Sequence, residues 1–193
     1  MCERREIMKK LVVIILAVFM MSSAALAMQV GKVTLPDSLM AGEDTLLLNG
    51  AGFRVKLFLK MYAGGLYLIQ KNHDPKKVID SDESMALRLH IVSGMITTKK
   101  MTDAIDEGFK NSTGENITSF KIEIAKYKSF FAEEIKKNDI FDIIYVPAEG
   151  ISVYKNESLK GTIQGFDFKK AVFGIWLGEK PADAKLKKGM LGQ

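Results

Sequence analysis

The spacing of apolar residues changes twice along the chain, and this limits the folds open to it. From residue 85 to 92 apolar residues alternate, with Met85, Leu87, Leu89 and Ile91 forming one set. Such alternation places one set of side chains on the buried face of a strand. From residue 97 to 131 the spacing becomes three or four, which is typical of amphipathic helices. Strand-like runs then return after residue 140.

The two expected helices have recognisable ends. Thr97 or Thr98 can cap the first helix, because a hydroxyl there accepts a hydrogen bond from an unpaired backbone N–H. Gly114 separates this helix from the second. Their apolar stripes are Met101, Ala104, Ile105 and Phe109 in the first, and Ile117, Phe120, Ile124, Tyr127 and Phe131 in the second.

The first half of the chain reads mainly as strands. A strand over residues 45–48 should end at a turn over residues 49–52, where the sequence is Asn-Gly-Ala-Gly. Residues 55–69 are strand-like, and Gly64 and Gly65 mark a bulge or a close approach of another segment. Asp74 and Pro75 begin a short helix that reaches about Asp80.

The second half completes the pattern and predicts the fold class. Strands are expected at residues 140–146, 151–154 and 159–163. Asp167 can cap a helix that ends at Gly178, and Pro181 can begin a last short helix. Hairpin-joined strands with segregated helices predict an α+β fold, an antiparallel sheet packed by helices on one face. This order is not a βαβ series, and residues 50–52 lack the remaining spacing of a dinucleotide fingerprint or a P-loop.

Residues 1–27 have the three parts of a secretory signal peptide. Arg4, Arg5, Lys9 and Lys10 precede an apolar run, which is followed by Ala25-Leu26-Ala27, a typical cleavage site. We therefore expect export to the periplasm, cleavage after Ala27 and one domain over residues 28–193. Either Met1 or Met8 can be the start, and an uncleaved anchor is the alternative to cleavage.

The composition of residues 28–193 argues against several classes of function. Removing the signal peptide leaves 24 basic and 21 acidic residues, a net charge of +3, so nucleic acid is not an expected partner. The one cysteine, Cys2, is lost with the signal peptide, which leaves no disulfide or thiol nucleophile. With only His73 and His90 remaining, the common zinc sites are excluded, and we expect no metal or other cofactor.

Several segments resemble the chalcone isomerase-like family, in its bacterial secreted branch. They are NGAGFRVKLFLKMYAGGLYL from residue 49, GTIQGFDFKKAVFGIWLG from residue 161, VTLPDSL, DIIYVPAEGISVYKN and the terminal LKKGMLG. The resemblance covers nearly all of residues 31–192. It implies a large antiparallel sheet packed by helices, with a ligand cleft between them. Plant members of the family isomerise chalcones to flavanones, and relatives without this activity bind fatty acids through an Arg and a Tyr.

The resemblance also assigns individual residues. The Arg of the family's G-x-G-x-R segment falls on Arg54, and the isomerase Thr falls on Tyr62, where the fatty-acid-binding branch has Tyr. The Tyr and Asn that the isomerases use at the start of the following helix fall on Thr97 and Ala104, so both polar groups are missing. The sequence thus favours a fatty-acid-binding site, with Arg54 and Tyr62 as its ligand-binding residues.

Arg54 and Tyr62 can meet only if the chain turns between them. In one straight strand they would lie about 26 Å apart, too far for one carboxylate. A hairpin near Phe58 would place them opposite each other, although residues 55–61 contain no Gly, Asn or Pro to favour a turn. The resemblance implies the hairpin. By parity in an extended chain, Lys56, Phe58 and Lys60 share the face of Arg54 and Tyr62.

Each assignment has a plainer alternative. Arg54 can be a charge at a strand end that faces water, and Tyr62 a core residue with a satisfied hydroxyl. Tyr67 and Trp176 are expected in the core, and His90 on the polar face with Arg88.

The predicted function is that of a periplasmic, non-catalytic binding protein for an apolar anionic ligand such as a fatty acid. No nucleic acid and no integral membrane segment after signal cleavage are expected as partners, and the oligomeric state stays open. The alternatives are an isomerase or intramolecular lyase, with Arg54 stabilising an oxyanion and Tyr62 donating a proton, and an envelope scaffold without a small ligand.

Overall fold

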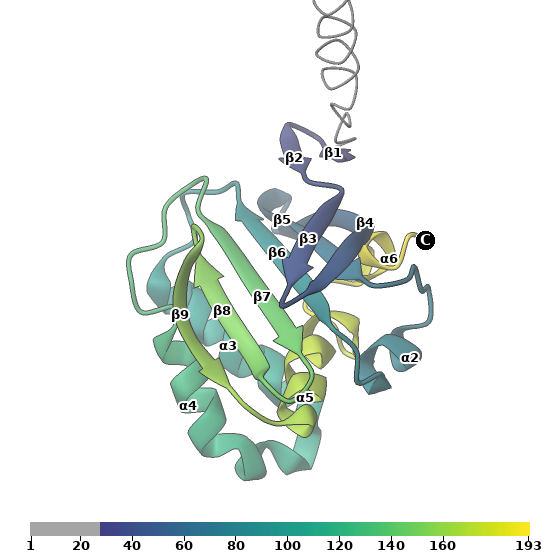
Figure 1. The fold of residues 1–193 in the computed structure, drawn as a ribbon. Helices are drawn as coiled ribbons and strands as arrows, with labels where there is room; N and C mark the ends of the chain where they lie inside the picture. The colour runs from purple at the N-terminus through teal and green to yellow at the C-terminus, as the bar shows by residue number, and fades with distance from the viewer. Residues whose placement is uncertain (1–27) are drawn as a thin grey trace, which may run out of the picture.

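The structure is a computed structural model that describes residues 28–193. The predicted signal peptide and its cleavage site after Ala27 lie outside the described residues, so export stays a prediction. Seven antiparallel strands form one sheet in chain order, from β3 to β9 (Figure 1). They are β3 (Ser38–Ala41), β4 (Asp44–Lys56), β5 (Leu59–Leu68), β6 (Met85–Ile91), β7 (Ile140–Val146), β8 (Gly150–Lys155) and β9 (Ser158–Ile163). Two short strands, β1 (Met28–Val30) and β2 (Val33–Leu35), pair only with each other in the described chain.

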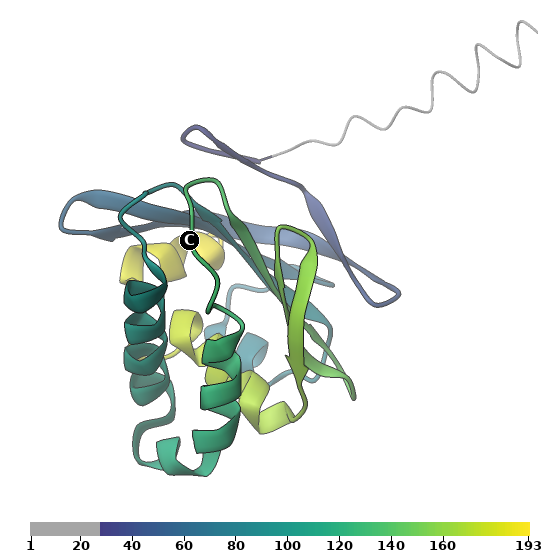
Figure 2. The ribbon, with the colours of Figure 1, turned by 90° about the vertical axis from the view of Figure 1, so that its left-hand side faces the viewer.

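The main helices pack on one side of this curved sheet, as Figure 2 shows. They are α2 (Pro75–Asp80), α3 (Thr98–Thr113), α4 (Lys121–Ser129), α5 (Phe166–Leu177) and α6 (Ala184–Met190), with the 3-10 helix η1 (Gly114–Phe120) between α3 and α4. The predicted α+β class, with an antiparallel sheet and helices on one face, is confirmed.

The main core lies between the sheet and the helices. The alternating set of β6 points into it, and the stripe of α3 meets it through Met101, Ile105 and Phe109. Helix α5 is buried on nearly all sides and fills the centre. Thr97 caps α3 as predicted, since its side chain accepts a hydrogen bond from the N–H of Lys100.

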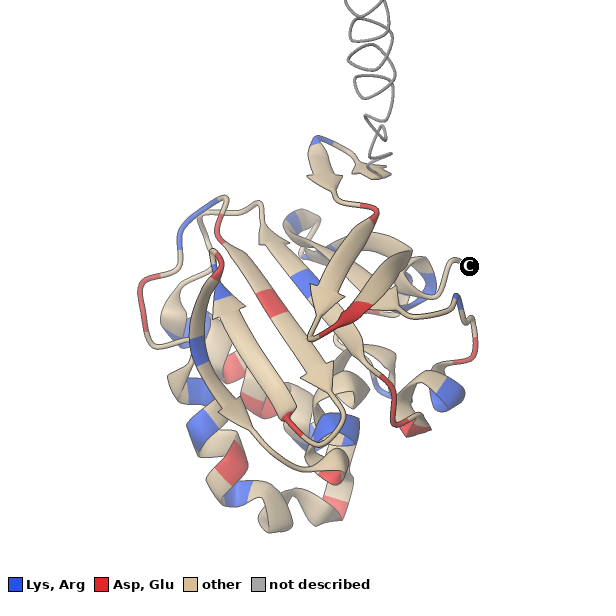
Figure 3. Cartoon of the chain, viewed as in Figure 1, with Lys and Arg blue, Asp and Glu red and all other residues tan. Residues whose placement is uncertain are grey.

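The opposite face of the sheet, called the outer face below, is partly covered by the N-terminal segment. Leu35 and Leu46 are fully buried there, and the hydroxyl of Tyr67 donates to the carbonyl of Pro36 at 3.0 Å. Figure 3 shows a basic segment of β6 beside an acidic segment of β7 on this face. These are Arg88 and Asp142, directly opposite in register and joined by two hydrogen bonds of 2.7 Å.

The turn predicted at residues 49–52 is wrong, because β4 runs straight through it. A side chain at Gly50 would place its Cβ only 2.2 Å from the carbonyl oxygen of Gly189, so the glycine admits the backbone of α6. Asn49 is also used differently. Its amide donates to the carbonyls of Asn72 and Met190, and its oxygen accepts from the N–H of Asn72.

Two helix starts differ from the prediction. Helix α5 begins at Phe166 after Gly165, which leaves Asp167 inside the first turn rather than at the cap. Helix α6 begins at Ala184 and not at Pro181. There the carboxylate of Asp183 accepts from two backbone N–H groups, and this local capping overrides the helix-starting preference of the proline.

Candidate functional site

The chain turns sharply between Arg54 and Tyr62. Leu57 and Phe58 form a two-residue turn with φ of 48° and 65° between β4 and β5. Arg54 and Tyr62 are directly opposite across this hairpin, as the resemblance implied. The straight strand that would hold them about 26 Å apart is therefore excluded. Whether the pair binds a ligand stays a prediction.

A bulge at Asn49 decides which face Arg54 occupies. Leu48 pairs with Tyr67 and Gly50 with Leu66, so Asn49 is an extra residue in β4. Before the bulge, even-numbered residues such as Leu48 face the outer cluster. An extra residue exchanges the faces of all that follow it. Arg54 consequently faces the helices, on the same side as Tyr62.

A second irregularity, at Met61, places Lys60 on the face opposite to the predicted one. Arg54 pairs with Tyr62 and Val55 with Lys60, which leaves Met61 unpaired in β5. Lys60 is thereby turned to the outer face, where its Nζ lies 4.3 Å from the ring centroid of Phe53. The prediction that Lys60 shares the face of Arg54 was wrong, because parity counting assumes a strand without bulges.

A cavity of about 300 Å³ opens beside the Arg54–Tyr62 pair. Its wall is mostly apolar and comes from the hairpin, the loop before α3, and α3 itself. The apolar members are Leu57, Leu59, Met61, Met95, Ile96, Met101 and Ala104, and the charged ones are Arg54, Lys56, Lys100, Asp103 and Glu107. The volume lies at the lower end of the range for small-molecule sites. Methionine walls are unbranched and flexible, and so can repack around an acyl chain.

The hydroxyl oxygen of Tyr62 accepts a hydrogen bond from Trp176. The indole Nε1–H donates to this oxygen at 2.8 Å, and only 2% of Tyr62 is exposed. Because the oxygen already accepts, its own proton is free to be donated. Burial raises the pKa of Tyr62, although Arg54 and the bond from Trp176 act against this shift. The residue is therefore a neutral hydrogen-bond donor at neutral pH. Trp176 is in the core as predicted, but sequence reasoning missed this contact.

Arg54 has no carboxylate partner in residues 28–193. It is half-buried, and its guanidinium carbon lies 5.8 Å from the centroid of the Tyr62 ring. The nearby Asp183 is occupied at α6 and by the N–H of Val55. Burial would raise the pKa of Asp183, but these backbone hydrogen bonds and the charge of Arg54 hold it below the ordinary value. Asp183 therefore makes its hydrogen bonds to backbone N–H groups and not to Arg54.

Tyr127 is a polar residue that the sequence placed in an apolar stripe. It is fully buried, and its hydroxyl has no hydrogen-bond partner in the described chain. Rings of Phe109, Phe131 and Phe168 surround it. Burial raises its pKa, and Tyr62 is close enough to add to the effect. It does not line the cavity, so its hydroxyl is not assigned to the site.

The two positions that carry the isomerase Tyr and Asn in the family contribute no polar side chain to the cavity wall here. Thr97 spends its hydroxyl on capping α3 and is not in the cavity wall. Ala104 does line the cavity but carries only a methyl group. In residues 28–193 no group of His, Cys, Asp or Glu is arranged to hold a metal ion. Within the same residues no helix has the length and apolar character needed to cross a bilayer.

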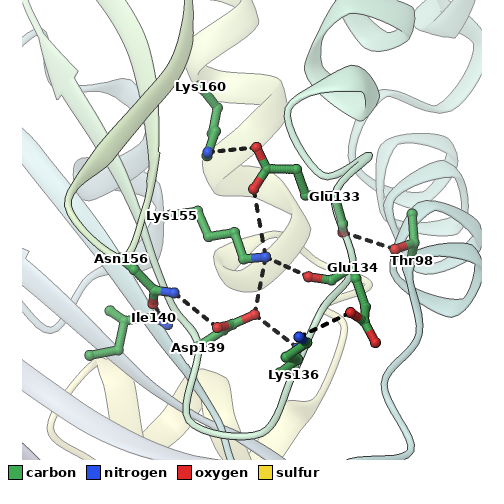
Figure 4. Close-up of polar contacts among 9 residues, drawn as sticks. All are labelled: Thr98, Glu133, Glu134, Lys136, Asp139, Ile140, Lys155, Asn156 and Lys160. Carbon is green, nitrogen blue, oxygen red and sulfur yellow. Dashed lines mark hydrogen bonds and ion pairs between the residues drawn. The ribbon is translucent and has the colours of Figure 1, made fainter.

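None of the residues of the polar cluster in Figure 4 lines the cavity, and the charges of the cluster are paired with one another. Lys155 lies 3.2 Å from Asp139 and 3.8 Å from Glu133, and it also donates to the carbonyl of Glu134. Lys160 completes the cluster at 2.7 Å from Glu133. These contacts fasten the segment before β7 to β8 and β9. Their charges are paired with each other, so the cluster has a structural role.

Comparisons with known proteins are consistent with this geometry. A family model described as chalcone isomerase-like matches residues 27–192. Among solved structures, a crystal structure of an Arabidopsis thaliana fatty-acid binding protein is similar, with a TM-score of 0.68 and 18% identity. The similarity covers 86% of this chain and 96% of that chain, and at this identity it shows a shared fold. No curated protein matches the chain.

Proposed function

The chain belongs to the chalcone isomerase-like family, and from this premise we propose that it is a periplasmic, non-catalytic protein that binds an apolar carboxylate such as a fatty acid. The acyl chain lies along the methionine-rich wall of the cavity. The head group lies between Arg54, which supplies a charged planar donor, and Tyr62, which supplies a neutral hydroxyl donor.

One observation carries the proposal. Arg54 lacks a carboxylate partner in the described residues, and it lies opposite a buried hydroxyl whose oxygen is already occupied by Trp176. A positive charge and a free donor at the mouth of an apolar cavity suit an amphipathic anion. The fold that the chain shares with a fatty-acid binding protein supports the same ligand class.

Binding is favoured over isomerisation by the state of Tyr62. A general acid works best with a pKa near the working pH. Burial instead raises the pKa of Tyr62 above its ordinary value of 10.0, which suits a hydrogen-bond donor better than a proton donor. Thr97 and Ala104 also leave no side chain to orient a flavonoid at this site. We therefore expect no cyclisation of naringenin chalcone above the uncatalysed rate.

Calorimetric titration of the delipidated protein with a long-chain fatty acid and with its methyl ester tests the proposal. The acid should bind more tightly than the ester to the wild-type protein. Replacing Arg54 with Ala removes a charge-assisted hydrogen bond worth about 1.5–3 kcal/mol, so the acid should bind about tenfold to a hundredfold more weakly. In Arg54→Ala the acid and the ester should bind alike.

Lys110→Ala serves as a control, since Lys110 is an exposed cation on α3 outside the cavity wall. It should retain the preference for the acid. If wild-type protein binds acid and ester equally well, Arg54 does not recognise the head group and is only a charge at the end of a strand. Mass spectrometry of protein from the periplasmic fraction tests the location, with an N-terminus at Met28 expected.

A further inference from the structure

The tip of the β4–β5 hairpin is strongly apolar and open to solvent. Phe58 is 99% exposed and Leu57 82%. Val55, Leu59 and Met95 beside them are also exposed, and these five residues are called the apolar tip below. They make up five of the eleven large apolar residues that are exposed in residues 28–193. Such clustering marks an interaction site, whereas single exposed apolar residues need no explanation.

The backbone at the tip is also unfavourable for the side chains it carries. Leu57 and Phe58 both have positive φ, a conformation that bulky residues avoid. Two-residue hairpin turns of this kind normally contain Asn-Gly or a similar pair. Leu-Phe therefore weakens the turn and adds no packing in the free protein. A conformational outlier with exposed apolar side chains indicates a function outside the folded chain itself.

Basic residues surround the apolar tip on both faces of the hairpin. Lys56 directly precedes the turn, Lys60 follows it after Leu59, and Lys100 lies at the cavity. On the outer face Lys60 lines a second hollow of about 750 Å³ together with Lys32 and Lys137. None of these five lysines forms an ion pair within residues 28–193. In Figure 2 the hairpin projects beyond the helices, so this end of the molecule can approach a surface.

Acidic residues near the tip do not cancel this charge. Asp103 and Glu107 line the cavity on the side of α3, and Asp103 is paired with Lys99 at 2.7 Å. Asp183 is occupied as the cap of α6. The exposed rim of the tip is therefore basic, and its natural complement is an anionic surface.

We propose that the apolar tip docks on a bilayer that contains anionic phospholipids. Leu57 and Phe58 insert at the boundary of headgroups and acyl chains, and the surrounding lysines contact the phosphates. A second copy of this chain is a poorer partner, because a symmetric contact through the tip would bring Lys56 and Lys60 against their own counterparts.

Docking in this way would bring the cavity to the membrane. Leu57 and Leu59 belong both to the apolar tip and to the cavity wall. A ligand could then move between the bilayer and the cavity without its acyl chain crossing water. This last consequence rests on the function proposed above, whereas the docking itself does not.

Cosedimentation with vesicles tests the docking, using protein from the periplasmic extract with the same N-terminus in every variant. Wild-type protein should bind vesicles of mixed phosphatidylglycerol and phosphatidylcholine, and bind pure phosphatidylcholine less. Added salt should weaken the first interaction, because it screens the lysines. Replacing Leu57 with Asn and Phe58 with Gly should lower the vesicle affinity about tenfold or more, since two large apolar side chains are lost.

Asn-Gly is the preferred sequence for this turn, so the same double variant should be at least as resistant to thermal unfolding as the wild-type protein. Loss of vesicle binding with retained stability then reports the surface and not the fold. Lys56→Glu with Lys60→Glu should remove the preference for phosphatidylglycerol. Ile122→Asn is a matched control, because Ile122 is 81% exposed on α4, away from the hairpin, and its vesicle binding should be unchanged.

Phe58→Gly separates the two proposals, since Phe58 does not line the cavity. It should lose vesicle binding and keep the fatty-acid affinity measured by calorimetry. Protein that binds vesicles but no fatty acid would contradict the proposed function and leave the docking standing. Equal vesicle binding by the wild-type protein and the Asn-Gly variant would overturn the docking. A dimer in solution that the Asn-Gly variant abolishes would overturn it too, in favour of a second copy of the chain.

Discussion

Arg54 and Arg88 are the two arginines of residues 28–193, and they stand on opposite faces of the same sheet. Arg88 lies in the middle of β6 and donates two hydrogen bonds of 2.7 Å to the carboxylate of Asp142. Arg54 lies near the open end of β4, faces the cavity, and has no carboxylate partner in the described residues. Burial opposes the charge of Arg88, but the contact with Asp142 still raises its pKa. The same residue type thus joins two strands in one region and lines a cavity without an ion pair among the described residues in the other.

The largest expected effect is on stability, and it separates these two roles. Arg88→Leu should lower the free energy of unfolding by about 2–3 kcal/mol, because it leaves the carboxylate of Asp142 buried without a partner. Arg54→Leu should change it by less than about 0.5 kcal/mol, since no partner is stranded. Urea denaturation of both variants measures the difference.

A double variant of the ion pair checks whether the stranded carboxylate causes the loss of stability. Arg88→Leu combined with Asp142→Leu strands no charge and should recover most of the loss. A double variant as unstable as Arg88→Leu would mean that packing around Arg88 is lost, and not the ion pair. A large loss in Arg54→Leu would show that Arg54 is a structural residue like Arg88.

Tyr62 and Tyr67 also lie on opposite faces of the sheet, and replacing either should have a smaller effect on the free energy of unfolding than replacing Arg88. Tyr62→Phe leaves the buried Trp176 N–H without an acceptor, and Tyr67→Phe leaves the Pro36 carbonyl without its donor. Each should lower the free energy of unfolding by about 1–2 kcal/mol. Only Tyr62→Phe should also weaken fatty-acid binding, by about 0.5–1.5 kcal/mol, because it removes a neutral donor from the site. Calorimetry with both variants decides this, and equal weakening by Tyr67→Phe would place the effect in the fold.

The sequence was a good guide where one local signal governs the structure. The alternation in β6, the Thr97 cap of α3 and the Gly114 boundary all appear as predicted. Residues 49–52 misled because a tertiary contact competes with the local turn preference, and Pro181 misled because a second local signal competes with it. Asn49 and Gly50 favour a turn, but α6 packs against them and β4 continues through. Pro181 favours a helix start, but Asp183 caps the helix and α6 begins after it.

The site was predictable only in part, for a related reason. Pairing of Arg54 with Tyr62 followed from the family resemblance, while residues 55–61 themselves show no turn signal. The extra residues Asn49 and Met61, which set the faces of Arg54 and Lys60, cannot be read from alternation. Contacts between distant segments, such as that of Trp176 with Tyr62, are also absent from local patterns.

Lys169 is a buried cation, unlike either arginine, and its contribution to the free energy of unfolding should depend on pH. It is fully buried, and its ammonium group donates to the carbonyls of Val78, Ile79 and Ser81. Burial lowers its pKa from 10.5 to about 8, although Asp82 and Asp80 oppose the shift. Between these two values the unfolded chain binds the extra proton, so rising pH favours the folded state.

The cost of burying this charge is present below pH 8 and is relieved as the pH rises toward 10.5. The wild-type protein should therefore gain at least about 1 kcal/mol relative to Lys169→Met between these pH values, since one unit of pKa difference corresponds to about 1.4 kcal/mol. Urea denaturation of both proteins across this range measures it. A constant difference between the two would mean that Lys169 keeps its ordinary pKa.

The smallest expected effect is at Tyr127, a polar group in the core that nothing in the described chain satisfies. Removing its hydroxyl strands no partner and relieves a buried unpaired group, so Tyr127→Phe should keep or raise the free energy of unfolding, by at most about 1 kcal/mol. Fatty-acid affinity should stay at the wild-type value, in contrast to Tyr62→Phe. Weaker binding in Tyr127→Phe would instead place this hydroxyl at the ligand, and so extend the site from the hairpin into the aromatic core around Phe109 and Phe168.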